Sequence, residues 1–156
     1  MLDWSRLDTK KVELRLEKVC VHQIATIVAD SLQMVASEKN ISLSITPVES
    51  LPPVQGDRDK LEQILMNLIG NAIKFTDHGS VTLSVSGDDA ADGDQVGLLF
   101  AVTDTGIGIP LYRQDEIFHS FTQADGSITR RYGGSGLGLS IVRSLVGLMG
   151  GEVRVR

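Results

Sequence analysis

The chain has 156 residues, the usual size of one domain, and 42% of them are apolar, which is enough to fill one core. Its formal net charge of -5 gives no general attraction to nucleic acid or anionic lipid, so local donors must hold any polyanion. A single cysteine, Cys20, excludes an internal disulfide and favours a reducing compartment. No run approaches the roughly 20 apolar residues that cross a bilayer, and the N-terminal segment lacks a signal-peptide core. We therefore expect a cytoplasmic domain that contacts neither nucleic acid nor membrane, and leave open a membrane anchor elsewhere in a longer protein.

The first part of the chain alternates between strand and helix patterns. Alternating apolar residues predict a half-buried strand over residues 11–19, and apolar residues at helical spacing predict an amphipathic helix over residues 22–39. Residues 41–45 alternate as a second strand. The proline-containing link over residues 51–55 is predicted to be a loop.

A second helix is predicted to begin after Asp57. The side chain of Asp57 suits an N-cap, and Asp59 and Glu62 place acidic groups in the first turn, where the helix dipole favours them. We expect Gly79 to end this helix.

Strands and a last helix follow. Residues 81–86 and 96–104 alternate, and the acidic turn at residues 87–94 joins them as a hairpin. Further along we expect a short helical piece at residues 112–118, a polar stretch at 122–135, a helix at 137–149 and a strand at 152–156. This order favours the α+β class, as a two-layer sandwich with helices on one face of a mixed sheet. The hairpin argues against a purely parallel, doubly wound sheet.

The second helix carries a polar face. Asn67, Asn71 and Lys74 lie at i, i+4 and i+7 and therefore share one side of the helix. The apolar residues that cover the other side are Leu61, Ile64, Leu65, Leu68, Ala72 and Ile73. Two amides and an ammonium suit a ligand that accepts hydrogen bonds and carries negative charge, such as phosphate with a divalent metal.

The segment DTGIGIP, residues 104–110, follows a predicted strand. Asp104 precedes Gly106 and Gly108, whose tight turn exposes backbone against which a flat ring can lie. The carboxylate can accept a hydrogen bond from an exocyclic amine such as that of adenine. Such a segment by itself is more often a strand-ending turn that binds no ligand.

A second glycine segment, GGSGLGLSI, occupies residues 133–141 and precedes the last helix. Backbone amides at the start of a helix form an anion-binding end that suits a phosphate chain. The amides in question belong to Gly134, Ser135, Gly136, Leu137 and Gly138. Taken alone the segment could also be a hinge, and it matches neither the P-loop nor the Rossmann glycine pattern.

Together and in this order, NLIGNAIKF, DTGIGIP, IFHSFTQ and GGSGLGL resemble the N, G1, F and G2 boxes of the ATP-binding catalytic domain of sensor histidine kinases. The resemblance covers residues 11–156. It implies the Bergerat-type ATP-binding fold of the GHKL superfamily, a two-layer α/β sandwich. It also implies binding of ATP with Mg²⁺ and phosphoryl transfer to a histidine.

The resemblance assigns roles to individual residues. Asn71 would hold Mg²⁺, Asn67 and Lys74 would approach the phosphates, and Asp104 would bind the adenine amine. The nucleotide-binding residues expected in this way are Asn67, Asn71, Lys74, Asp104, Gly106, Gly108, Ile109, Phe121, Arg130, Gly134, Ser135, Gly136, Leu137 and Gly138.

Residues 122–132 would form the ATP lid. Phe118 and Phe121 match the F box, where aromatic residues anchor the lid, although plain core packing explains them nearly as well. Arg130 and Arg131 could swing onto the γ-phosphate or could be a solvated basic pair. Many relatives have arginine just after the F box, where this chain has Gln123.

The resemblance also divides the chain and names its partners. Residues 1–10 resemble the tail of a preceding dimerisation helix and its linker, and residues 11–156 the ATP-binding domain with its last strand cut short. His22, His78 and His119 lack the setting of a phosphoacceptor, so we expect no catalytic residue here and no autophosphorylation by the chain alone. The partners implied are ATP, the histidine-bearing dimerisation domain of the same kinase, and a response regulator or receiver domain.

Two other functions remain open. A gyrase-like or Hsp90-like ATPase would carry a glutamate, the general base for water, one turn before the metal-binding asparagine. This chain has Asn67 there, an amide that cannot take a proton, and Lys74 where the hydrolases usually have an acidic residue. A signalling module that binds a partner but no nucleotide is the second alternative.

Overall fold

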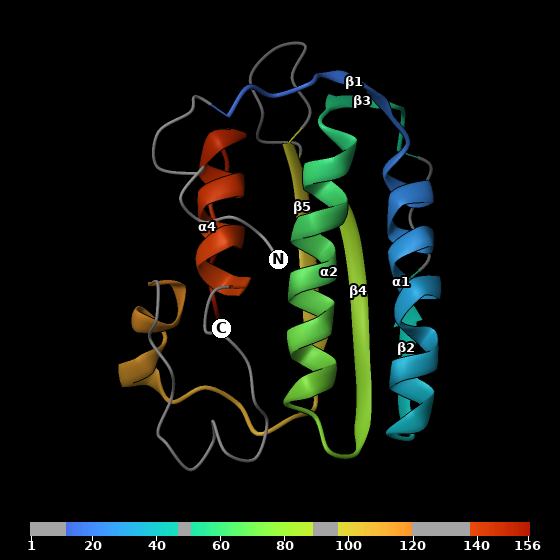
Figure 1. Cartoon of the computed structure of the whole chain (residues 1–156), viewed down its shortest axis with the longest axis vertical. Helices are drawn as coiled ribbons and strands as arrows, with labels where there is room; N and C mark the ends of the chain where they lie inside the picture. Colours follow the sequence, from blue (N-terminus) through green and yellow to red (C-terminus); the bar gives the residue numbers. More distant parts are fainter. Residues whose placement is uncertain (1–11, 47–50, 89–96, 120–137) are drawn as a thin grey trace.

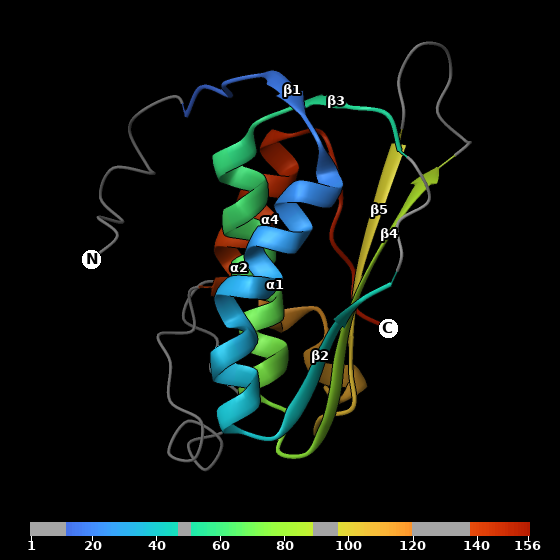
Figure 2. The same cartoon turned by 90° about the vertical axis from the view of Figure 1, so that its right-hand side faces the viewer.

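Helices lie side by side over one face of a sheet in this computed structural model, which describes residues 12–46, 51–88, 97–119 and 138–156 (Figure 1). Figure 2 shows the helices in one layer and the strands in the other. The elements in chain order are β1 (Glu17–Val19), α1 (Val21–Glu38), β2 (Ile41–Ile45), β3 (Val54–Gly56), α2 (Arg58–Lys74), β4 (Gly79–Asp88), β5 (Gly97–Asp104), the 3-10 helices η2 (Leu111–Arg113) and η3 (Glu116–Phe118), and α4 (Gly138–Leu148). The predicted two-layer α+β fold is confirmed.

The main sheet is mixed. β2 is parallel to β4, with Ile41 opposite Gly79, and β4 is antiparallel to β5, with Val81 opposite Asp104. The predicted hairpin is therefore confirmed, with β4 beginning two residues earlier than expected. A parallel pair followed by an antiparallel pair is incompatible with a purely parallel sheet.

The first predicted strand and the loop over residues 51–55 are partly wrong. Only Glu17–Val19 is a strand, and it pairs antiparallel with Val54–Gly56, which overlaps the segment expected to be a loop. Two prolines without N–H groups precede Val54, so a ladder can begin only after them. Before β1, the amide of Arg15 donates to Asp57 Oδ2 at 2.9 Å instead of to a neighbouring strand.

Helix α2 starts as predicted and ends earlier. Asp57 is the N-cap, and its Oδ1 accepts a hydrogen bond from Lys60 N at 3.2 Å. The helix stops at Lys74, where Phe75 is the C-cap, so Gly79 does not end it. Gly79 begins β4 with φ +122°, and a Cβ there would collide with Thr105 Oγ1.

Helix α2 is buried on two sides. Its Leu65, Ile69 and Ile73 belong to the main core with α1 and the sheet, while Ile64 packs in a second cluster with α4. Ile69 is completely buried although it was absent from the predicted apolar face, and Leu68 packs at the edge of the second cluster. The polar residues of α2 therefore occupy the narrow strip that remains.

The uncovered face of the sheet is rich in hydroxyl groups, although Leu99 of β5 is also exposed there. Val81, Leu83 and Val85 of β4 are buried towards the helices, so the residues between them point the other way. There Ser44 Oγ lies 3.3 Å from Thr82 Oγ1, across the β2–β4 pair. This face is open to water in the part of the chain that the structure describes (Figure 2).

The end of the chain differs from expectation in one element. The predicted last helix is confirmed as α4, and the predicted helical piece at residues 112–118 is the pair η2 and η3. Residues 152–156 have no strand ladder, so that prediction is wrong. Gly151 N donates back to Val146 O at 2.9 Å, and Glu152 pairs locally with Arg154 at 2.8 Å. Among the described helices, none combines the length and apolarity that crossing a bilayer requires.

Candidate nucleotide-binding site

The polar ridge of α2 faces the start of α4. Asn67, Asn71 and Lys74 are half-buried on one side of α2. A Cβ on Gly138 would lie 3.4 Å from Asn67 Oδ1 and 3.6 Å from Asn71 Nδ2. The first residue of α4 therefore lies against both asparagines, and the helix start and the two amides share one surface.

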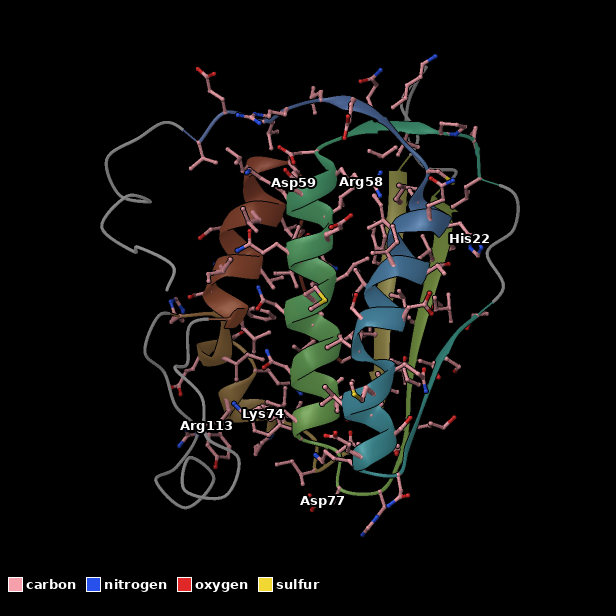
Figure 3. All side chains as sticks on the ribbon, turned by 45° about the vertical axis from the view of Figure 1, so that its right-hand side comes forward. His22, Arg58, Asp59, Lys74, Asp77 and Arg113 are labelled. Carbon is pink, nitrogen blue, oxygen red and sulfur yellow. The ribbon has the colours of Figure 1, made fainter. Side chains whose placement is uncertain are left out.

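Lys74 is the last polar residue of this ridge, at the C-terminal end of α2 (Figure 3). Its ammonium lies 5.4 Å from the centroid of the Phe75 ring. Burial lowers the pKa of Lys74 from its usual 10.5, because the charged form loses hydration there. A phosphate beside this ammonium would compensate for the lost hydration.

The DTGIGIP segment is hydrogen-bonded to the same end of α2. Asp104 Oδ1 accepts a hydrogen bond from Gly106 N at 2.8 Å, and Ile107 N donates to Phe75 O at 3.2 Å. A Cβ on Gly106 would collide with Phe75 O and would lie 2.8 Å from Thr76 Oγ1. Glycine is thus required for the turn to approach the helix end so closely.

The remaining residues of this turn face outward. Gly108 has φ +72°, a backbone conformation that glycine adopts readily. Ile109 is 39% exposed, and Asp104 is also exposed. The carboxylate and the isoleucine therefore line an open surface and not a closed cavity.

A cavity of about 670 Å³ lies elsewhere, and it is lined by residues 114–115, the end of η3, α4 and residues 151–155. Phe118 and Arg143 are among its lining residues, but none of the predicted nucleotide-binding residues that the structure describes lines it. We place the candidate site at the ridge and turn, because the groups suited to a nucleotide converge there.

Several predicted residues lie outside the described part of the chain. The lid segment 122–132 with Arg131 and Gln123 is among them, so its role stays a prediction. The predicted site residues concerned are Phe121, Arg130, Gly134, Ser135, Gly136 and Leu137. Phe118 is described and buried, which agrees with core packing.

Sequence reasoning missed two residues beside the site. Thr76 is completely buried, and its hydroxyl has no hydrogen-bond partner in the described structure. Lys39 lies 35 positions before Lys74, and its Nζ donates to Ile73 O at 2.7 Å and to Lys74 O at 3.1 Å. No local pattern marks either residue, because both contacts arise from the tertiary fold.

No group of three His, Cys, Asp or Glu side chains that could hold a metal occurs among the residues described. A hard cation at this site would depend on amide oxygen, water and the phosphates of its ligand. The half-buried amides of Asn67 and Asn71 are chemically suited to such a site.

Residues 56–156 match the sequence profile of the family described as "Histidine kinase-, DNA gyrase B-, and HSP90-like ATPase". The chain belongs to this ATPase family. The matched region begins just before α2 and includes the ridge, the DTGIGIP turn and α4. The region that matches the family model therefore contains the elements that converge at the candidate site.

Individual relatives come from the histidine kinase branch of the family. The hybrid signal transduction protein dokA of Dictyostelium discoideum is 46% identical over 99% of this chain and 9% of its own length. ShkA, solved at full length in complex with AMPPNP, is 38% identical with a TM-score of 0.79, covering 94% of this chain and 29% of its own. The mycobacterial sensor histidine kinase MprB is 28% identical with a TM-score of 0.70, covering 91% of this chain and 85% of its own. The resemblance to sensor histidine kinases is confirmed, and the chain spans only a small part of dokA and ShkA.

Proposed function

We propose that this domain binds ATP with Mg²⁺ and presents the γ-phosphate to a histidine on a separate dimerisation domain, as part of a two-component sensor histidine kinase. The observation that carries the proposal is the convergence of Asn67, Asn71 and Gly138 beside Lys74. Amide donors, an ammonium and a helix start on one surface fit a phosphate chain.

The phosphate end of the ligand lies along the ridge. Asn67 and Lys74 donate to phosphate oxygens, and the N-terminus of α4 at Gly138 offers the positive end of a helix dipole. The amides of Gly134, Ser135, Gly136 and Leu137 extend this end in our proposal, and Arg130 approaches from the lid.

The base end lies at the DTGIGIP turn. One oxygen of Asp104 is engaged by Gly106 N, so the second oxygen can accept a hydrogen bond from the adenine amine. Gly106 and Gly108 bring the backbone close to the ring, and Ile109 and Phe121 supply apolar contact. This geometry favours adenine over guanine, which has a carbonyl at the position of that amine.

Asn71 is the proposed protein ligand of Mg²⁺, which takes few protein ligands and keeps several waters. When bound, the ion neutralises phosphate charge and orients the triphosphate. The chain's own groups position the nucleotide, and Asn67 offers no base for water at the place where the family's hydrolases carry one. This favours phosphoryl transfer over hydrolysis.

The whole protein's activity follows from this placement. In this proposal residues 11–156 belong to the ATP-binding domain, and the sequence of residues 1–10 corresponds to the tail and linker of a preceding dimerisation domain. The acceptor histidine belongs to that dimerisation domain, and a receiver domain or response regulator takes the phosphoryl group onward. The name of dokA, a hybrid signal transduction protein, supports such partners. We also propose a cytoplasmic location, where ATP is available.

Titration of the chain with nucleotide by calorimetry tests the proposal. Tight binding of MgATP and weak binding of MgGTP are expected. Asp104→Asn should reduce the preference for ATP over GTP, and Asn71→Asp should weaken the Mg²⁺-dependent part of ATP binding by about 10- to 100-fold.

Asp30→Asn, an exposed change on α1, is the matched control and should bind as the parent does. If Asp104→Asn and Asn71→Asp both bind MgATP as well as the parent, the site assignment is wrong. Sustained phosphate release from ATP by the isolated chain would instead favour the hydrolase alternative.

A further inference from the structure

The side chain of Lys39 joins the end of α1 to the end of α2. Its backbone is the C-cap of α1, with Lys39 N donating to Ala36 O at 3.2 Å, and Asn40 follows with φ +56°. A helix cap and a left-handed residue fix the point from which the side chain extends. The ammonium then reaches Ile73 O at 2.7 Å and Lys74 O at 3.1 Å.

These carbonyls belong to the turn that carries the proposed phosphate contacts. The last carbonyls of a helix lack partners within it and form the negative end of its dipole. The next carbonyl, of Phe75, accepts Ile107 N from the DTGIGIP turn. Three consecutive carbonyls at the C-terminal end of α2 and its cap are thus held, two by Lys39 and one by the DTGIGIP turn.

The direction of α2 makes this contact more than a structural cap. A triphosphate on Asn71 and Lys74 lies beside the C-terminal half of α2, where the partial charge of the helix is negative and opposes an anion. An ammonium on these carbonyls offsets that charge and fixes the backbone of Lys74.

We propose that Lys39 is a positioning residue of the nucleotide site, which orients the last turn of α2 and neutralises its dipole for the phosphates. This inference rests on the proposed function. It predicts that the contribution of Lys39 grows with the charge of the ligand. The binding affinity of adenosine, which carries no phosphate, should not change when Lys39 is replaced.

The test compares ligands as well as variants. Dissociation constants for MgATP, ADP and adenosine are measured by calorimetry or NMR titration on the parent, Lys39→Met, Lys39→Gln and Lys39→Arg. Lys39→Met should raise the dissociation constants of MgATP and ADP by about 3- to 10-fold and leave that of adenosine within about 2-fold of the parent value. Lys39→Arg, which keeps the charge and the donors, should restore most of the affinity.

The other variants separate the contributions. Lys39→Gln keeps a donor without the charge, so it should resemble Lys39→Met if neutralising the dipole dominates, and Lys39→Arg if holding the carbonyls dominates. The first result supports both parts of the proposal, whereas the second supports the orienting role and overturns the neutralisation of the dipole. Lys18→Met, an exposed lysine in β1, is the matched control and should bind all ligands as the parent does.

Three outcomes contradict the inference in distinguishable ways. Equal losses for adenosine and MgATP would show a general loss of structure and overturn the positioning role. Unchanged MgATP affinity in a folded Lys39→Met would overturn the inference alone and leave the proposed function in place. A parent that binds no nucleotide would overturn the proposed function and the inference with it.

Discussion

At the scale of single residues, Asp57 combines two tasks with one carboxylate. It is nearly fully buried, caps α2 through Lys60 N, and accepts Arg15 N from the segment before β1. Burial raises the pKa of Asp57, but the hydrogen bonds from Arg15 N and Lys60 N, together with the positive charges of Lys60 and Arg15, outweigh it, so the pKa is lowered from its usual 3.8. The ionised form is therefore the one that stabilises the fold.

Replacing this carboxylate gives a prediction with a defined pH dependence. Asp57→Ala should lower the free energy of unfolding by about 1–3 kcal/mol at neutral pH, because it removes the cap and leaves the Arg15 amide without its partner. The pKa is lower in the folded state, so this contribution is fully present above about pH 3.8 and is lost as the pH falls through the folded pKa. Urea unfolding of parent and variant at neutral and acidic pH measures both effects.

The Asp57→Asn variant is the control for this prediction. Asp57→Asn keeps a capping oxygen and should lose less stability than Asp57→Ala at neutral pH. A stability difference between parent and Asp57→Ala that stayed constant into strong acid would show that the charge of Asp57 has no part in it.

At the scale of elements, α2 explains what the sequence could and could not predict. Its N-cap follows from one residue and its neighbours, as do the positions of α1, β2, the hairpin and α4, so local patterns predicted them. The burial of Ile69 and the β1–β3 ladder depend on tertiary partners, and the periodicity of one segment does not contain them. The predicted motifs contributed Asn67, Asn71 and Gly138, but not their closeness in space.

Lys39 and Thr76 show the same limit at the site. Lys39 acts on carbonyls of another helix, and the burial of Thr76 depends on the turn at Gly106. In the sequence, Lys39 is only a lysine at the end of one helix, and Thr76 is only a threonine just after the end of another. Neither position differs locally from a solvated one.

The packing of α4 on α2 yields a prediction at this scale. Leu145, 6% exposed, belongs to the cluster that joins the two helices, whereas Leu148 on the same helix is 41% exposed. Leu145→Ala should cost about 2–5 kcal/mol of stability, and Leu148→Ala less than about 1 kcal/mol. Thermal or urea unfolding of the two variants measures the difference.

The same pair tests whether α4 holds Gly138 against the asparagines. In Leu145→Ala, a looser α4 should also weaken MgATP binding under conditions where the variant is folded. Leu148→Ala should leave that affinity unchanged. Equal nucleotide affinities for the two variants would contradict this prediction and show that the α2–α4 packing does not affect nucleotide binding.

At the scale of the whole molecule, the proposed nucleotide site and the exposed His22 lie at opposite ends of the helix layer. Figure 3 shows His22 at the start of α1 and Lys74 at the opposite end of the helix layer. His78 and His119 are exposed as well. Our proposed function places the acceptor histidine on a separate domain, so we expect none of these three surface histidines to accept the phosphoryl group.

The chain alone should therefore bind MgATP without phosphorylating itself. Incubation with labelled ATP should leave no acid-labile phosphate on the chain, while a supplied histidine-bearing dimerisation domain should become labelled. Replacing Asn71 should abolish that labelling. Label that accumulates on the chain itself, and disappears when His22, His78 or His119 is replaced, would contradict this division of roles.

The hydroxyl-rich face of the sheet has a practical consequence for such experiments. Ser44 and Thr82 alternate along their strands with residues that are buried against the helix layer. With Cys20 replaced by serine, a fluorophore attached at a cysteine in place of Ser44 would therefore occupy the opposite side of the molecule. Such a dye would report tumbling, and hence docking onto a larger partner, while leaving the nucleotide surface unobstructed.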